Sequence, residues 1–145
     1  MYFQSVLFIA ITGFSFTRGE LWKYVVSITT ASTLWPFIDL GTDDDIYITM
    51  NGNWNTLTLP KFLLDNKNHY DFQEGHTDVF IWNDEPIGRF SLAELCNEEG
   101  TDDDPFVVKK VEIKIFNSNG SKITHVVFKG KYDLGWKHCA YLKAP

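Results

Sequence analysis

The chain has 145 residues, a length typical of one domain built around a single hydrophobic core. Its 44% hydrophobic and 22% charged residues exclude a disordered or collagen-like chain. The net charge of -6, without any run of Lys or Arg, excludes the electrostatic signature of a nucleic-acid binder. Aromatic residues make up 16% of the chain, which favours an all-β fold because aromatic side chains suit pleated surfaces and sandwich cores.

The first 19 residues contain an apolar run over residues 6–16. This run is shorter than the roughly 20 residues that a membrane-spanning helix needs, and its length is typical of the central region of a signal peptide. Thr17 and Gly19 place small residues three and one positions before a cleavage site. We therefore expect a signal peptide over residues 1–19, a secreted protein and a single domain over residues 20–145. Alternatively, the apolar run forms an additional strand.

The chain has two cysteines, Cys96 and Cys139, without the close spacing of a zinc or redox motif. The sequence is compatible with either a disulfide between them or two buried thiols. Secretion would favour the bridge, which would close a loop of roughly 43 residues. Secretion would also make the only N-x-S/T sequon, Asn119-Gly120-Ser121, a candidate glycan site on a turn.

Alternating apolar residues predict most of the chain to be strands. The β-branched and aromatic run over residues 22–31 predicts the first strand, and strict alternation over residues 45–51 predicts the second. The Asn51-Gly52 turn signal predicts a hairpin to a short strand over residues 55–59. Further strands are expected over residues 76–82, 107–116 and 122–129 and around residues 136–142.

One segment has a helical signature. Ser91 and Glu94 have the spacing of a capping box, which predicts one or two helical turns over residues 91–95. Seven or eight strands with almost no helix indicate an antiparallel two-sheet β-sandwich, whose connecting loops gather at two ends.

Carboxylates concentrate in two loops. Asp43, Asp44 and Asp45 open the second predicted strand, where alternation places Asp43 and Asp45 on one side and Asp44 on the other. Calcium prefers six to eight oxygen ligands, so a second loop has to contribute. The polar segment after the hairpin offers such oxygens, from Asp65, Asn66, Asn68 and Asp71. The alternative is a pair of solvated acidic turns whose Asp side chains cap backbone amides.

Three stretches of the chain resemble a known family. They are GTDDDIYITMNG at residues 41–52, LLDNKNHYDFQEGHTDVF at residues 63–80 and VKKVEIKIFNSNG at residues 108–120. Together they look like the PLAT (lipoxygenase homology) domain, and the second stretch is also similar to the C-terminal domain of the clostridial alpha-toxin phospholipases. The resemblance implies an eight-stranded β-sandwich that binds calcium in loops at one end and directs its host to membranes, lipids or protein partners.

The resemblance also implies a ligand set. It places Gly41, Thr42, Asp43 and Asp45 in the first calcium loop and Asp65, Asn66, Asn68 and Asp71 in the second. The chain departs from the family over residues 117–120, where Asn-Ser-Asn-Gly lacks the Asp of the family's turn, and in the following run, which lacks its Trp.

Aromatic residues flank the predicted calcium loops. Trp35 and Phe37 come just before Gly41, and Trp54 stands between two Asn at the predicted hairpin tip. Such rings can anchor in the headgroup layer of a membrane once a cation masks the acidic charge. Alternatively, Trp35 or Phe37 turns inward and plugs the end of the sandwich.

No catalytic motif is found in the sequence: there is no G-x-S-x-G, no H-E-x-x-H and no phosphate-binding Gly-rich loop. The sequence therefore predicts a non-enzymatic, secreted module that binds Ca²⁺ and, through it, lipid or membrane surfaces. The alternative is a calcium-independent protein–protein interaction module of the same fold.

Overall fold

The computed structural model describes residues 19–33, 40–53, 58–67, 69–98, 106–135 and 138–145. No helix in these ranges is long and apolar enough to span a bilayer. The residues of the predicted signal peptide lie almost entirely outside them.

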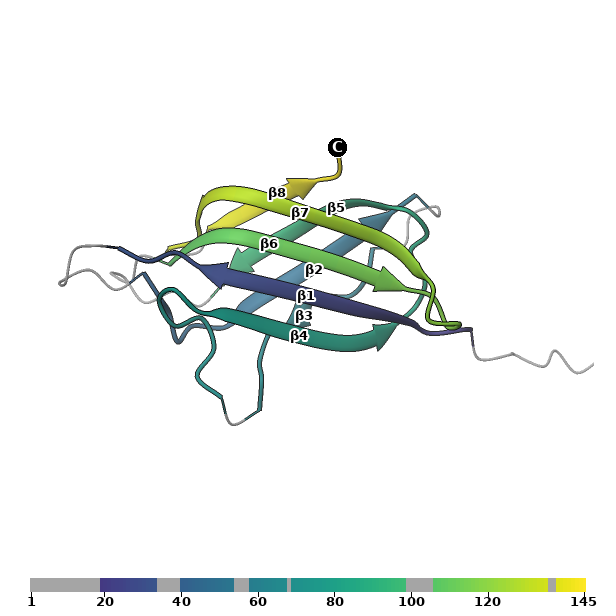
Figure 1. The fold of residues 1–145 in the computed structure, drawn as a ribbon, viewed down its shortest axis with the longest axis horizontal. Coiled ribbons are helices and arrows are strands. Elements are labelled where there is room, and N and C mark those ends of the chain that lie inside the picture. The colour runs from purple at the N-terminus through teal and green to yellow at the C-terminus, as the bar shows by residue number, and fades with distance from the viewer. Residues whose placement is uncertain (1–18, 34–39, 54–57, 68, 99–105, 136–137) are drawn as a thin grey trace, which may run out of the picture.

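In the described part of the chain, eight strands form two four-stranded antiparallel sheets, which confirms the predicted antiparallel sandwich (Figure 1). The first sheet has the order β4-β1-β6-β7 and the second the order β3-β2-β5-β8. The strands are β1 (Trp22–Thr30), β2 (Ile46–Gly52), β3 (Phe62–Leu63), β4 (Thr77–Asp84), β5 (Phe90–Asn97), β6 (Val107–Phe116), β7 (Lys122–Asp133) and β8 (Cys139–Lys143).

The core lies between the two sheets because alternate residues of the long strands are apolar and point inward. Tyr24, Val26 and Ile28 of β1 are fully buried, as are Ile46 and its inward neighbours on β2. An aromatic cluster extends this core to the sandwich edge: the Trp82 ring stacks with the rings of both Phe62 and Tyr24, at centroid distances of 4.1 Å and 5.6 Å. Packing of the two sheets around this core brings loops from both sheets together at each end of the sandwich.

Strand register defines the two ends. At one end, Thr30 donates its backbone N–H to His76, beside the loops that precede β2 and β4. We call this the acidic end; it holds the first acidic loop (residues 40–45) and the second acidic loop (residues 64–76). At the other end, Lys23 pairs with Phe116 beside the β6–β7 turn, and we call it the hairpin end.

The predicted helix over residues 91–95 is wrong. These residues belong to β5, which is hydrogen-bonded to β2 on one side and β8 on the other. The local capping signal at Ser91 and Glu94 is outweighed because a central strand satisfies its backbone on both sides and buries Ala93 and Leu95.

The predicted hairpin partner of β2 is only partly seen. Thr58 forms an isolated bridge with Asn51, and residues 54–57 lie outside the described ranges. The strand beside β2 is instead β3, two residues long, which falls in a segment expected to be a loop. The last predicted strand begins at Cys139, and β7 continues four residues beyond its expected end at residue 129.

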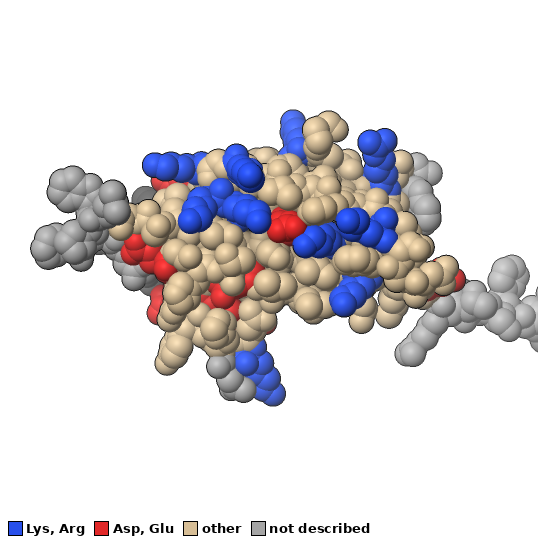
Figure 2. Space-filling model, viewed as in Figure 1, with Lys and Arg blue, Asp and Glu red and all other residues tan. Residues whose placement is uncertain are grey.

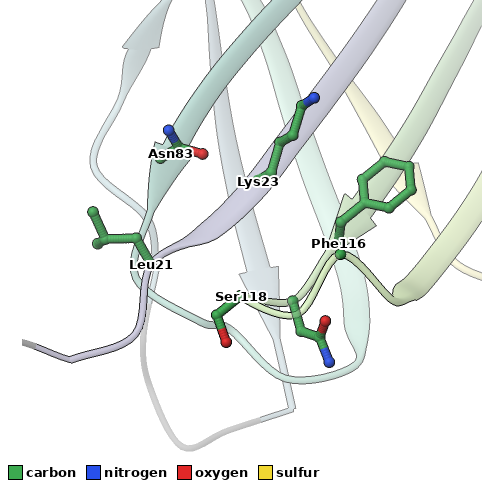
Figure 3. Close-up of a pocket in the computed structure, with 7 residues that line it drawn as sticks. Leu21, Lys23, Asn83, Phe116 and Ser118 are labelled. Atoms are coloured by element: carbon green, nitrogen blue, oxygen red, sulfur yellow. The ribbon is translucent and has the colours of Figure 1, made fainter.

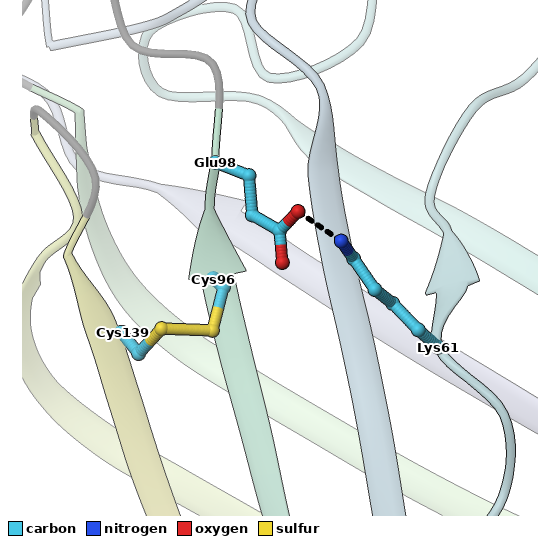
Figure 4. The surroundings of a disulfide bond; sticks show 4 residues. All are labelled: Lys61, Cys96, Glu98 and Cys139. Atoms are coloured by element: carbon cyan, nitrogen blue, oxygen red, sulfur yellow. Dashed lines mark hydrogen bonds and ion pairs between the residues drawn. A yellow bond between two sulfur atoms is a disulfide. The ribbon is translucent and has the colours of Figure 1, made fainter.

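Cys96 and Cys139 form a disulfide between directly paired residues of β5 and β8 (Figure 4). It lies close to the acidic end, one residue from the last residue of β5. An ion pair between Lys61 and Glu98 spans β2 nearby, and the Lys61 ammonium lies 4.0 Å from the centre of the Tyr47 ring. These contacts tie neighbouring strands of the second sheet together beside the loops.

Candidate functional site

The two acidic loops meet at one end of the sandwich. Thr42 of the first loop donates its backbone N–H to the carbonyl of Phe72 in the second loop, at 3.3 Å. The Thr42 hydroxyl is buried and accepts a hydrogen bond from the Asp44 N–H, which folds the first loop back on itself. Thr42 and Phe72 are 30 positions apart in the sequence, and the fold brings their loops together into one surface.

A hollow of about 140 Å³ lies between the loops. Among the described residues, five carboxylates line it, and neither Lys nor Arg does. The lining residues are Thr42, Asp43, Asp44, Asp45, Leu64, Asp65, His69, Tyr70, Asp71 and Phe72. A second, wider hollow continues from it, sharing Thr42, Asp43, Tyr70 and Asp71 and adding Gly41, Gln73 and Glu74. The structure thus brings together Gly41, Thr42, Asp43, Asp45, Asp65 and Asp71 of the predicted ligand set.

Asp71 is held in place by Asn66. Its two carboxylate oxygens accept hydrogen bonds from the Asn66 backbone N–H at 2.6 Å and from the Asn66 side-chain amide at 2.8 Å. Each carboxylate oxygen has a second lone pair, so both remain able to ligate a cation. Asn66 therefore orients a carboxylate of the hollow, although Asn66 itself is not among the residues that line it.

Asp44 also lines the hollow, although strand alternation had placed it away from Asp43 and Asp45. One of its oxygens accepts a hydrogen bond at 2.9 Å from the side chain of Asn97, a buried residue at the end of β5. The alternation rule fails here because β2 begins only at Ile46, so the three Asp residues are not in a pleated strand.

Asp78 is a functional candidate that the sequence analysis missed. It is only 4% exposed, accepts a hydrogen bond from the Phe72 N–H at 2.8 Å and lies 3.3 Å from the His69 ring nitrogen. His69, Asp71 and Asp78 each offer a ligand atom within 4.8 Å of the others. The signal was an acidic residue on the same strand parity as Phe80 and Trp82, the parity that the structure turns inward.

Four predicted site residues lie outside the described ranges: Trp35, Phe37, Trp54 and Asn68. The departure from the family over residues 117–120 falls in the β6–β7 turn at the hairpin end. That turn lies at the opposite end of the sandwich from the hollow, so the absence of an Asp there removes no ligand from this site.

The outer face of the first sheet has the opposite charge (Figure 2). Among the charged side chains in this view, Lys and Arg are spread over the sheet, whereas most of the Asp and Glu side chains lie towards the acidic end. Glu112 of β6 lies in the basic area, and its carboxylate contacts Lys114 at 2.8 Å, His125 at 2.9 Å and Lys110 at 3.2 Å. Hydrogen bonds from these three side chains lower the pKa of Glu112 from 4.5 to about 2.

A family model for the PLAT/LH2 domain matches residues 24–133. The chain belongs to the PLAT/LH2 domain family. The match covers β1 through β7 and both acidic loops of the domain. PLAT domains are non-catalytic units. The comparison with curated proteins gave no significant match.

Solved structures show the same fold. A coral 8R-lipoxygenase, described as activated by calcium through a C2-like domain, superposes with a TM-score of 0.65 at 22% identity, over 83% of this chain and 16% of that one. A calcium-dependent 11R-lipoxygenase gives 0.62 at 20% identity, over 84% and 17%. The alpha toxin of Clostridium absonum gives 0.61 at 18% identity, over 88% and 32%. The PLAT domain therefore spans about a sixth to a third of these larger proteins.

The donor set of the hollow suits calcium. Calcium takes oxygen ligands in a flexible geometry, and carboxylates from both acidic loops supply them. His69 is the one nitrogen donor among the lining residues, and thiols are absent from them. A hollow of about 140 Å³ leaves room for an ion together with several waters, since each water occupies about 30 Å³ in the liquid.

Proposed function

We propose that this PLAT domain binds calcium between its two acidic loops and that the bound ion attaches the acidic end to a lipid or membrane surface. The observation that carries the proposal is that five carboxylates from two distant loops line one hollow, with neither Lys nor Arg among its described lining residues. Like charges held this close favour a counter-cation. The predicted ligands are Gly41, Thr42, Asp43, Asp45, Asp65, Asn66, Asn68 and Asp71, and we add Asp44 to them.

Lipid contact would follow from charge neutralisation. Without an ion, the acidic end is repelled by anionic lipid, whereas calcium both removes that repulsion and bridges to phosphate oxygens. Thr33 and Leu40, which flank the segment with Trp35 and Phe37, are hydrogen-bonded at the acidic end to Glu74 and Val107. We propose Trp35 and Phe37 as the anchoring rings.

Trp54 does not fit the same contact. The residues that flank its segment, Asn53 and Thr58, follow β2 at its Gly52 end, whereas the acidic loop enters β2 at Ile46. A membrane contact of Trp54 would therefore need a second attachment point, and we leave Trp54 out of the proposal.

In this proposal, the domain acts outside the cytosol and catalyses no reaction itself. The Cys96–Cys139 disulfide supports the compartment because disulfides persist in oxidising environments. The calcium-regulated lipoxygenases named above support a role in which a domain of this fold couples calcium to a surface or to a partner chain.

Calcium binding is tested by thermal unfolding with and without the ion. Calcium at 100 times its dissociation constant should add about 2.7 kcal/mol to the unfolding free energy. Replacing Asp43→Asn together with Asp45→Asn should weaken calcium binding at least about tenfold, or about 1.4 kcal/mol, by titration calorimetry. The matched control, Glu20→Gln with Glu85→Gln, removes the same two charges from exposed side chains at the hairpin end and should leave binding unchanged.

Membrane association is tested by pelleting with anionic vesicles, in calcium and in chelator. Binding in calcium alone, lost in the Asp43/Asp45 variant, is the expected result. Equal binding in both conditions would refute the role of calcium in membrane attachment. No binding in either condition would refute the lipid role and leave the calcium-independent protein-interaction module as the better description.

A further inference from the structure

The β6–β7 turn at the hairpin end contains two asparagines, and the backbone of the turn is hydrogen-bonded by the side chain of Asn117. The turn is closed by Asn117, whose N–H donates to the Ser121 carbonyl and whose side-chain oxygen accepts from the N–H groups of Asn119 and Ser121. Asn119, Gly120 and Ser121 are all exposed. Gly120 has φ +79°, and a Cβ there would meet no atom within 4 Å, so the tip projects into open solvent.

These three residues are an Asn-Gly-Ser sequon. An oligosaccharide is transferred only to an Asn whose amide is accessible and whose Ser or Thr follows two positions later. Asn117 takes the structural role that an Asn has in a turn, which leaves the Asn119 amide available for modification.

A hollow of about 470 Å³ lies at the foot of this turn (Figure 3). Its lining residues are Leu21, Lys23, Asn83, Phe116, Asn117, Ser118 and Gly120. Asn119 does not line the hollow itself, but Ser118 and Gly120, the residues on either side of it, do. Phe116 is half-buried and stands three residues before Asn119. An aromatic ring offers a flat apolar surface that suits the C–H face of a sugar ring, just as it suits other apolar contacts.

We propose that Asn119 is N-glycosylated and that the first N-acetylglucosamine of the glycan packs against Phe116 in this hollow. In the transfer, the Asn119 side-chain nitrogen forms a bond to C1 of the sugar at the reducing end of a lipid-pyrophosphate-linked oligosaccharide. The bond between C1 and the phosphate oxygen breaks, the lipid pyrophosphate leaves, and the amide proton passes to a base of the transferase. No oxidant or reductant is needed.

A glycan at Asn119 would orient the domain relative to a membrane. A glycan is bulky and strongly hydrated, so it keeps the hairpin end away from any bilayer and leaves the acidic end free at the opposite side of the sandwich. This inference is independent of calcium binding, because no residue of the acidic loops takes part, but it rests on the proposed location outside the cytosol.

The site is tested by expressing the full 145-residue chain in eukaryotic secretory cells and measuring its intact mass before and after peptide N-glycosidase treatment. The expected result is an added mass that the enzyme removes. Asn119→Gln and Ser121→Ala should each abolish it, whereas Ser121→Thr should keep it. A chain that carries no glycan, whether it is secreted or retained, would overturn the proposal.

The sugar–ring contact is tested separately by a double-mutant cycle. Melting temperatures are compared for Phe116 and Phe116→Ala, each with the glycan trimmed to its first sugar and each with Asn119→Gln. The sugar should raise the melting temperature of the Phe116 protein and have little effect in the Ala background. Equal shifts in both backgrounds would refute the packing against Phe116. Calcium titration of the same samples shows whether the acidic end works independently.

Discussion

Asp78 shows how one buried carboxylate shapes the acidic end. It accepts the N–H of Phe72, a non-glycine residue with φ 59°, and so holds the second acidic loop in its turn beside the first. Phe72 in turn accepts the Thr42 N–H, so the hydrogen bonds run from β4 through Phe72 to the first loop. The hollow between the loops therefore depends on a residue that is largely hidden from solvent.

Replacing Asp78→Ala should destabilise the domain by about 1–3 kcal/mol, because the Phe72 N–H would remain buried without an acceptor. Urea unfolding monitored by tryptophan fluorescence measures the loss. The matched control is Asp65→Ala, an exposed carboxylate of the same hollow, which should change stability by no more than about 0.5 kcal/mol. Equal stability of the two variants would remove the structural role assigned to Asp78.

Among the elements, β5 and β6 show two ways in which neighbouring strands decide the outcome. The segment at Ser91 has local helix signals, yet it forms a strand because β2 and β8 pair with both of its edges. On β6, Glu112 is surrounded by Lys110 and Lys114 of its own strand and His125 of β7. The strand structure of β5 depends on pairing with strands that are distant in sequence. The charge cluster at Glu112 depends on strand geometry, which places Lys110, Lys114 and His125 on the same face.

The Glu112 cluster predicts a specific acid sensitivity. Its pKa is about 2 in the folded protein and near 4.5 when unperturbed, so the folded state favours the ionised form. This contribution to stability is complete above about pH 4.5 and is lost as the pH falls towards 2. Glu112→Gln should lower the unfolding free energy at pH 6 and flatten its decline between pH 5 and 3, as measured by urea titrations. Parallel pH profiles for the two proteins would contradict this.

At the scale of the whole molecule, the fold separates two kinds of surface. The acidic loops occupy one end, the lysines spread over the outer face of the first sheet, and the glycan proposed at Asn119 lies at the other end. This separation places the proposed calcium site and the proposed glycan at opposite ends of the sandwich. It also explains how a chain of net charge -6 carries a basic face.

The Cys96–Cys139 disulfide should stabilise the whole domain, because it restricts the unfolded chain over a sequence separation of 43 residues. Replacing both residues with Ser should lower the unfolding free energy by about 2–4 kcal/mol under oxidising conditions. In reducing buffer, the original protein and the double variant should unfold at similar urea concentrations. A difference that persists after reduction would assign the effect to packing instead of the cross-link.

The sequence by itself determined the sandwich, because alternation over the long strands records which side of each strand meets the core. It also identified the two carboxylate-rich loops, since Asp43 to Asp45 and Asp65 to Asp71 are local clusters. Only the tertiary structure decided that these loops share one hollow, that Asp44 joins it and that the inward parity of β4 places Asp78 beneath it. Those facts depend on strand order and register, which are set by contacts between segments far apart in the chain. Only Asp78 left a local signal, its shared strand parity with Phe80 and Trp82, and the sequence did not show that this parity faces inward.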